Sequence, residues 1–172
     1  GMARSRTVPC IVQNAAPEEE VGDPLRPRAA AESFARDAVH FAGQAQNRRL
    51  LVRAYVWEGL AFAAAPAVDL EAARRCYDEA IRLDPKNARA YVNRGSAWGT
   101  KGDLDRAIAD FNQAIRLDPK DAQAYYNRGI AWEKKRRLRE ALADFKIHSQ
   151  LVPSDPNGLK AVERVLKELS AR

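Results

Sequence analysis

The sequence is poor in the residues from which disulfides and metal sites are built. Its 172 residues include two cysteines, Cys10 and Cys76, and two histidines, His40 and His148. The cysteines lie far apart, and no histidine stands at metal-ligand spacing from a cysteine or from the other histidine. Disulfide frameworks and zinc sites need several such residues at short, regular spacings. We therefore expect no disulfide, no metal site and no cofactor.

Long apolar runs and catalytic motifs are also missing. No stretch approaches the roughly 18 apolar residues that cross a bilayer. The N-terminal residues lack the apolar run of about 7 to 15 residues found in a secretory signal. The sequence contains no Gly-rich phosphate loop and no H-E-x-x-H motif. We therefore expect a cytoplasmic protein without a membrane span, and not an enzyme.

Basic residues exceed acidic ones, 29 to 23, for a net charge of +6. The dense basic run falls at an expected turn between helices and consists of Lys134, Lys135, Arg136, Arg137 and Arg139. Such a run is a solvated turn, a contact for an acidic partner, or a nucleic-acid contact or localisation signal. Nucleic acid is the least favoured partner, because the aromatic residues are committed to the core and are not interleaved with the basic ones.

An internal repeat organises most of the chain. Residues 88–98, ARAYVNRGSAW, return at residues 122–132 as AQAYYNRGIAW. The second half of each unit recurs as well. A less well-matched copy precedes these two units. Three copies fill residues 54–155, at 54–87, 88–121 and 122–155. A fixed period of about 34 residues indicates a solenoid of stacked units.

Each copy is predicted to form two helices. Tyr91, Gly95 and Trp98 stand at i, i+4 and i+7, which places them on one helix face. The second helix places Ala107, Phe111 and Ala114 on its own face. The residues placed as caps are Asp69, Asn87, Asp103, Asp121 and Asp155 at helix starts and Gly102 at a helix end.

The pattern of aromatic, glycine, aromatic, alanine, phenylalanine, alanine and proline resembles the tetratricopeptide repeat (TPR). It is met in full by Tyr91, Gly95, Trp98, Ala107, Phe111, Ala114 and Pro119. The resemblance implies an all-α solenoid, a right-handed superhelix of antiparallel helix pairs, that binds proteins or peptides. The first copy departs from the pattern, because the strict period puts Ala61 at the glycine position and Ala64 at the second aromatic position.

Three segments flank the repeats. Residues 1–30 contain four prolines and are predicted to be a flexible leader, followed by a helical extension at 31–53. Residues 156–172 are predicted to form a capping helix whose apolar face covers the last repeat. That face is Leu159, Val162, Leu166 and Leu169.

The leading helices of the three copies are expected to line a groove for a peptide. The positions opposite the core face are Tyr55, Glu58, Phe62, Arg89, Asn93, Ser96, Gln123, Tyr126, Asn127, Ile130 and Glu133. Asn93 and Asn127 can donate to and accept from an extended peptide backbone. The alternative is that both asparagines belong to an ordinary solvated surface. Arg94 and Arg128 are expected to pair with acidic neighbours or to cover apolar surface.

Some TPR domains hold the terminal carboxylate of a chaperone peptide with lysine, asparagine and arginine side chains. Here the resemblance places Glu58 and Phe62 at the first two of these positions, and Gln123 and Asn127 at the last two. Only Asn93 fits, so a clamp of this kind is not expected. The sequence therefore favours a non-enzymatic adaptor for a protein or peptide, an acidic one included. The alternative is a self-assembly module whose groove is filled by its own leader or by a second copy.

Overall fold

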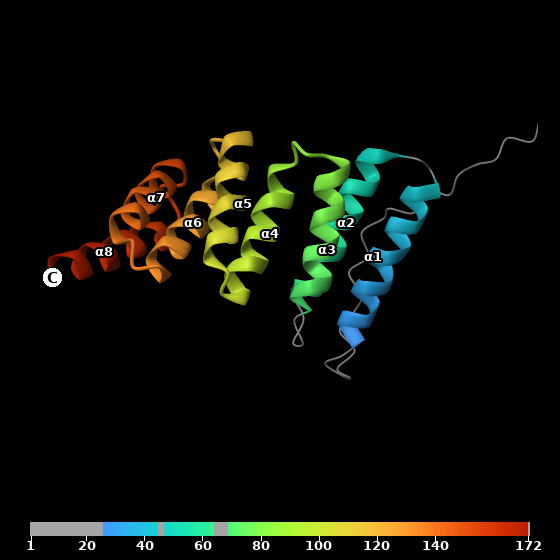
Figure 1. Ribbon diagram of the computed structural model, residues 1–172, viewed down its shortest axis with the longest axis horizontal. Coiled ribbons are helices and arrows are strands. Elements are labelled where there is room, and N and C mark those ends of the chain that lie inside the picture. The colour runs from blue at the N-terminus through green and yellow to red at the C-terminus, as the bar shows by residue number, and fades with distance from the viewer. Residues whose placement is uncertain (1–25, 45–46, 64–68, 172) are drawn as a thin grey trace, which may run out of the picture.

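The computed structural model describes residues 26–44, 47–63 and 69–171, and these ranges form eight helices and no strand. The helices are α1 (Arg26–Gln44), α2 (Arg48–Ala63), α3 (Leu70–Leu83), α4 (Ala88–Lys101), α5 (Leu104–Leu117), α6 (Ala122–Lys134), α7 (Leu138–Leu151) and α8 (Pro156–Ser170). They follow one another in chain order along an elongated array (Figure 1). The expected contacts of the leader lie in residues 1–25, outside the described residues.

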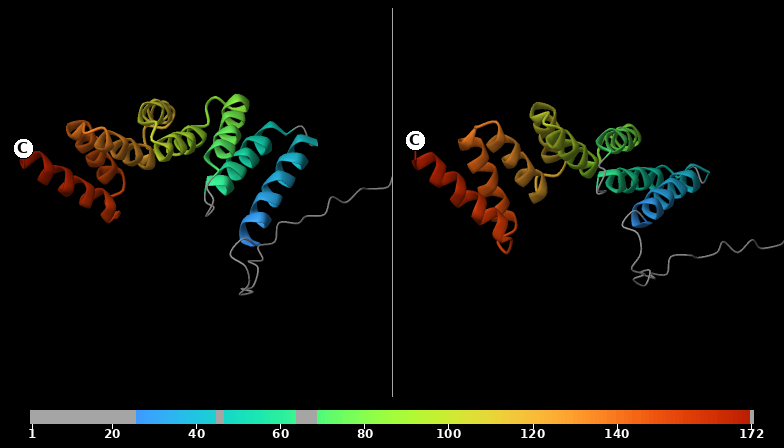
Figure 2. Two further views of the ribbon diagram at one scale, coloured as in Figure 1. Left: turned by 60° about the horizontal axis from the view of Figure 1, so that its bottom comes forward. Right: turned by 90° about the horizontal axis from the view of Figure 1, so that it is seen from below.

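The predicted caps are present. The side chains of Asn87, Asp103 and Asp121 each accept a hydrogen bond from the backbone N–H three residues on. Gly102 ends α4 with a φ of 90°, a conformation that glycine adopts without strain. These short turns hold consecutive helices antiparallel, as the views in Figure 2 show.

The helices pack as pairs, and the pairs stack. α2 packs on α3, α4 on α5 and α6 on α7, while α2 also contacts α4 and α4 contacts α6. Glycine permits the close approach inside each pair: a Cβ atom at Gly95 would lie 2.8 Å from Phe111, and one at Gly129 would lie 2.7 Å from Phe145. The all-α solenoid predicted from the repeat is confirmed.

The first copy has a different register from the one expected. Gly59 lies against Tyr77 in the way that Gly95 lies against Phe111. Gly59 precedes Gly95 by two positions more than Gly95 precedes Gly129, so two more residues separate the helices of the first pair. Ala61 is therefore not the glycine equivalent. The aromatic, glycine, aromatic triplet of this copy is Tyr55, Gly59 and Phe62, with the same i, i+4 and i+7 spacing as in the others.

Arg94 and Arg128 each form an ion pair inside their own repeat, as expected, and also bond to the repeat before it. Arg94 donates to both Asp110 oxygens, at 2.6 and 2.8 Å, and to Asp78 of the preceding pair at 2.8 Å. Arg128 makes the same bonds to Asp144 and to Asn112. These hydrogen bonds raise the pKa of Arg94, chiefly through Asp110. Each arginine therefore fastens one repeat to the repeat before it.

The same two positions are occupied differently in the first pair. With the shift of two residues, Glu58 stands where Arg94 stands, and Cys76 stands where Asp110 stands. Burial, with the charge of Glu58 and a hydrogen bond to it, raises the pKa of the Cys76 thiol to about 12. The thiol is therefore protonated at neutral pH, and Glu58 belongs to the interface between α2 and α3.

The capping helix packs with a different face from the predicted one. Gly158, Ala161 and Val165 are the buried residues of α8, whereas Leu159 and Leu166 are 52% and 45% exposed. Val162 and Leu169 are only partly buried against the last pair. The prediction for Leu159 and Leu166 was wrong, because the choice among neighbouring apolar residues depends on how the helix is rotated about its axis.

Where α8 packs against α7, a large residue of α7 faces a small residue of α8. His148 is buried, and its ring nitrogens face the carbonyl oxygen of Ala122 at 3.1 Å and Asp155 Oδ2 at 3.0 Å. A Cβ atom at Gly158 would lie 2.5 Å from the His148 ring. At the equivalent places one repeat earlier, Ala114 and Ala124 lie in one core cluster. Gly158 therefore makes room for the larger side chain.

The N-terminal boundary also differs from the expected one. α1 begins at Arg26, inside the segment assigned to the leader. Pro27 is compatible with this start, because the N–H groups of the first turn have no partner within the helix. α1 packs against α2 in the way that the second helix of each later pair packs against the helix that follows it.

Candidate functional site

The inner face of the solenoid is the side of α2, α4 and α6 that points away from Gly59, Gly95 and Gly129. These three helices contact one another in succession, so their side chains form one continuous surface. Stacked helical repeats curve, and the curvature gives such proteins an extended concave surface for binding. The predicted groove residues are placed relative to this inner face.

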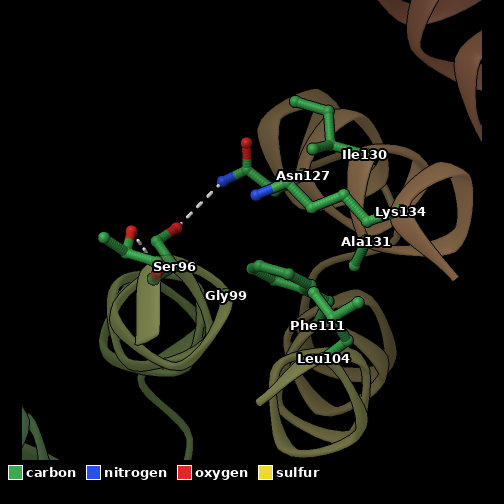
Figure 3. A pocket seen from close by; sticks show the side chains of 9 residues that line it. Ser96, Gly99, Leu104, Phe111, Asn127, Ile130, Ala131 and Lys134 are labelled. Carbon is green, nitrogen blue, oxygen red and sulfur yellow. Dashed lines mark hydrogen bonds between the residues drawn. The ribbon is translucent and has the colours of Figure 1, made fainter. Parts of the chain in front are cut away.

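The two asparagines of the inner face have different surroundings. Asn127 Nδ2 donates to Ser96 Oγ at 3.1 Å (Figure 3), and Asn127 Oδ1 accepts from Gln123 Nε2 at 2.7 Å. This carboxamide thus joins α6 to α4. Within the described part of the chain, Asn93 makes no side-chain hydrogen bond. Asn93 therefore keeps its full donor and acceptor capacity for a ligand.

The first repeat contributes apolar residues to the inner face. With the shift of two residues, Trp57 and Leu60 take the positions held by Asn93 and Ser96 in the second repeat. Both are exposed, Trp57 to 65% and Leu60 to 39%. Neither was predicted from the sequence. The triplet of Tyr55, Gly59 and Phe62 is the signal that could have placed them.

Two predicted groove residues of this repeat pack into helix interfaces instead. Tyr55 packs against the cluster of Val52, Ala80 and Ala90, and burial is the main reason that its pKa is raised. Phe62 packs against the cluster that contains Tyr77. The structure thus places Tyr55 and Phe62 on the core side of α2.

α7 and the cap engage two further predicted residues. Glu133 accepts two hydrogen bonds of 2.8 Å from Arg164 of α8. The ring of Tyr126 lies 5.5 Å from that of Phe145 and 4.9 Å from that of His148. Arg89 and Gln123 are exposed and border an open polar hollow near the ends of the helices. Asn93, Ser96, Asn127 and Ile130 remain together on the inner face.

A small cavity opens between α4, α5 and α6 (Figure 3). Its volume is about 170 Å³. The floor is apolar, and the mouth carries hydroxyl, carboxamide and ammonium groups. The lining residues are Ser96, Gly99, Thr100, Leu104, Phe111, Asn127, Ile130, Ala131 and Lys134.

Ion pairs within the chain neutralise most of the basic run. Lys135 pairs with Asp105, Arg136 with Glu168, and Arg137 with Glu140. Arg137 also lies over the Trp132 ring, 4.6 Å from its centroid. Lys134 and Arg139 make no ion pair with the described residues. Of the five, only Lys134 lines the cavity.

Two structural findings bear on other kinds of site. In residues 26–44, 47–63 and 69–171, no group of three or more histidine, cysteine and acidic residues could hold a metal ion. No helix in these ranges is long and apolar enough to cross a membrane.

Comparison with known proteins identifies the family. Residues 69–99 and 100–135 match the model of the TPR repeat. The matched segments cover α3 to α6, and the same helix pairing continues on both sides. Residues 69–135 belong to the TPR repeat family, and the described chain folds as a TPR solenoid. No curated protein sequence matches this chain.

Solved structures show the same architecture. MamA has a TM-score of 0.72 at 18% identity, over 88% of this chain and 86% of its own. The first TPR of Spaghetti (RPAP3), bound to the HSP90 peptide SRMEEVD, has a TM-score of 0.66 at 24% identity, over 69% and 93%. The second TPR of Spaghetti, bound to the same peptide, is 30% identical with a TM-score of 0.58, over 62% and 95%.

Proposed function

We propose that the protein is a non-enzymatic adaptor whose inner face binds an extended segment of a partner protein. The observation that carries the proposal is Trp57, a large apolar side chain that is 65% exposed on this face. Exposed aromatic residues are common at binding hot spots. The second TPR of Spaghetti, 30% identical to this chain, was solved with a peptide bound and supports the same use here.

Different residues of the inner face contact the side chains and the backbone of the partner segment. Trp57 and Leu60 offer an apolar anchor for one residue of the segment. The Asn93 carboxamide makes no hydrogen bond to the described residues, so it can bond to both the N–H and the C=O of an extended peptide. The Asn127 carboxamide already makes hydrogen bonds to Gln123 and Ser96. We therefore expect it to shape the inner face rather than to bind the peptide backbone itself.

A terminal carboxylate is not what this face recognises. The shift of two residues moves the first clamp positions from Glu58 and Phe62 to Val56 and Leu60, which are apolar. No lysine or arginine stands at Gln123 or Asn127 either. We therefore expect the ligand to be an internal segment of the partner protein, bound through its own side chains and backbone.

Selection from a random peptide library on the full chain tests the proposal. For a selected peptide, Trp57→Ala should weaken binding by about ten-fold or more, as a hot-spot loss does. Asn93→Ala should weaken it by about five-fold, the value of one hydrogen bond. Leu159→Ala and Gln150→Ala, exposed residues off this face, are matched controls and should change nothing. Unchanged affinity in both inner-face variants would refute the proposal.

A further inference from the structure

Gly99 has no structural reason to be glycine. It lies inside α4 without a positive φ, and a Cβ atom there would lie 3.8 Å from Ala107 Cβ, an ordinary contact. A helical glycine is less stable than alanine by up to about 1 kcal/mol. The equivalent positions hold Ala63 in the first repeat and Glu133 in the third. What Gly99 does provide is space, because it borders the cavity between α4, α5 and α6.

The cavity has the size of one side chain. A dry protein cavity of about 150 Å³ holds a benzene molecule, and this one measures about 170 Å³. Its floor of Leu104, Phe111 and Ala131 offers only apolar contacts. A whole drug-sized ligand needs about 300 Å³ or more. The cavity therefore suits an isobutyl or phenyl group rather than a complete small molecule.

The mouth of the cavity is positively charged. Lys134 reaches across it, with its ammonium group between Asn127 and Phe111 in Figure 3. The neighbouring charges are already satisfied, because Lys101 pairs with Glu71 and Glu133 with Arg164. Lys134 has no such partner among the described residues. An anionic group next to the buried apolar one would complement it.

We propose that this cavity binds one leucine-sized or phenylalanine-sized side chain of the partner segment, with an adjacent carboxylate on Lys134. The inference rests on the proposed function, since the cavity opens on the same inner face. It narrows the partner to a segment in which an apolar residue and an acidic residue are neighbours.

Three small probes that share a phenylethyl group and carry a negative, a neutral or a positive end group test the cavity directly. They are 3-phenylpropanoate, 3-phenylpropanamide and 3-phenylpropylammonium, each titrated into the full chain and followed by NMR at the Gly99 amide and the Ile130 methyl groups. The anion should bind about three-fold more tightly than the amide, the size of one exposed ion pair, and the cation should bind most weakly. Equal binding of all three, or shifts elsewhere only, would overturn the proposal.

Variants of two cavity residues, Lys134 and Gly99, separate charge from shape. Lys134→Gln should abolish the preference for the anion and leave the amide unchanged, whereas Lys146→Gln, on an exposed residue of α7, should do neither. Gly99→Leu should weaken all three probes, and Gly99→Ala should keep most of the binding. A preference for the anion that survives Lys134→Gln would overturn the assignment of the cation, even if Gly99→Leu did not fold.

The outcomes distinguish this proposal from the adaptor function. If library peptides bind the wild type and Gly99→Leu equally, the inner face binds peptides and the cavity proposal fails. If the probes bind in the cavity and no library peptide is selected, the cavity stands as a site and the adaptor function fails.

Discussion

Gly95 and Gly99 stand one turn apart in α4 and have opposite surroundings. A Cβ atom at Gly95 would lie 2.8 Å from the Phe111 ring and 3.2 Å from the Ala107 carbonyl oxygen, whereas at Gly99 the nearest atom is 3.8 Å away. One glycine is required by the approach of α5, and the other leaves a cavity open. The residue type alone does not distinguish these two roles.

The same substitution at the two glycines should therefore have opposite effects. Gly95→Ala should lower the free energy of unfolding by about 1 to 3 kcal/mol through overpacking. Gly99→Ala should raise it by up to about 1 kcal/mol through helix propensity. Urea denaturation of both variants measures the difference. A Gly95→Ala protein as stable as the wild type would show that the α4–α5 packing is not as described.

Single residues also show what could be read from the sequence. The partners of Arg94 and Arg128 were predictable in kind, because a basic residue beside a core face needs an acidic neighbour. The inner-face position of Trp57 was not found, because a strictly fixed period hides the two residues added in the first pair. The cavity at Gly99 was not predictable, since it depends on what three helices leave unfilled.

At the scale of elements, α8 shows how the last repeat is closed. His148 and Gly158 take the places of Ala114 and Ala124, so a large residue facing a small one replaces two small ones. The existence of a capping helix was predictable from its cap and its apolar spacing. Its rotation was not, because Ala161 and Val165 compete with Leu159 and Leu166 for the same contact.

A double-mutant cycle tests this complementarity. Gly158→Ala alone should destabilise the protein, because the new methyl group meets the His148 ring at 2.5 Å. His148→Ala alone should also destabilise it, through lost hydrogen bonds and a cavity. The double variant should be more stable than the sum of the two losses predicts, by about 1 kcal/mol or more. Additive losses in thermal or urea unfolding would contradict the pairing.

The hydrogen bonds at the start of α8 predict a pH dependence. The Asn157 backbone N–H, and then His148, hold the pKa of Asp155 below its usual 3.8. A lowered carboxyl pKa stabilises the fold above the unfolded value, and that stabilisation is lost as the pH falls through the folded one. The stability advantage of the wild type over Asp155→Ala should therefore shrink as the pH falls below 3.8. An advantage that does not change as the pH falls below 3.8 would contradict this.

At the scale of the whole molecule, the solenoid exposes apolar residues at both ends. Phe41 of α1 is 67% exposed, and Leu159 and Leu166 lie on the outer side of α8. Such residues favour the self-assembly alternative. However, Glu163 lies between the two leucines on the same side of α8, and burying an unpaired carboxylate is costly.

We therefore expect the protein to be a monomer with its inner face open. Size-exclusion chromatography with light scattering should give the mass of one chain across a wide range of concentrations. A dimer or larger species that Leu159→Ser or Phe41→Ser converts to a monomer would favour self-assembly through the ends of the solenoid.

Site-specific photo-crosslinking shows where on the solenoid the bound segment lies. A photoreactive residue is placed at Asn93 on the inner face or at Ala109, an exposed position of α5, and a library-selected peptide is added. We expect a crosslink from position 93 that unlabelled peptide competes away, and none from position 109. A crosslink from position 109 alone would place the partner on the outer helices and rule out binding at the inner face.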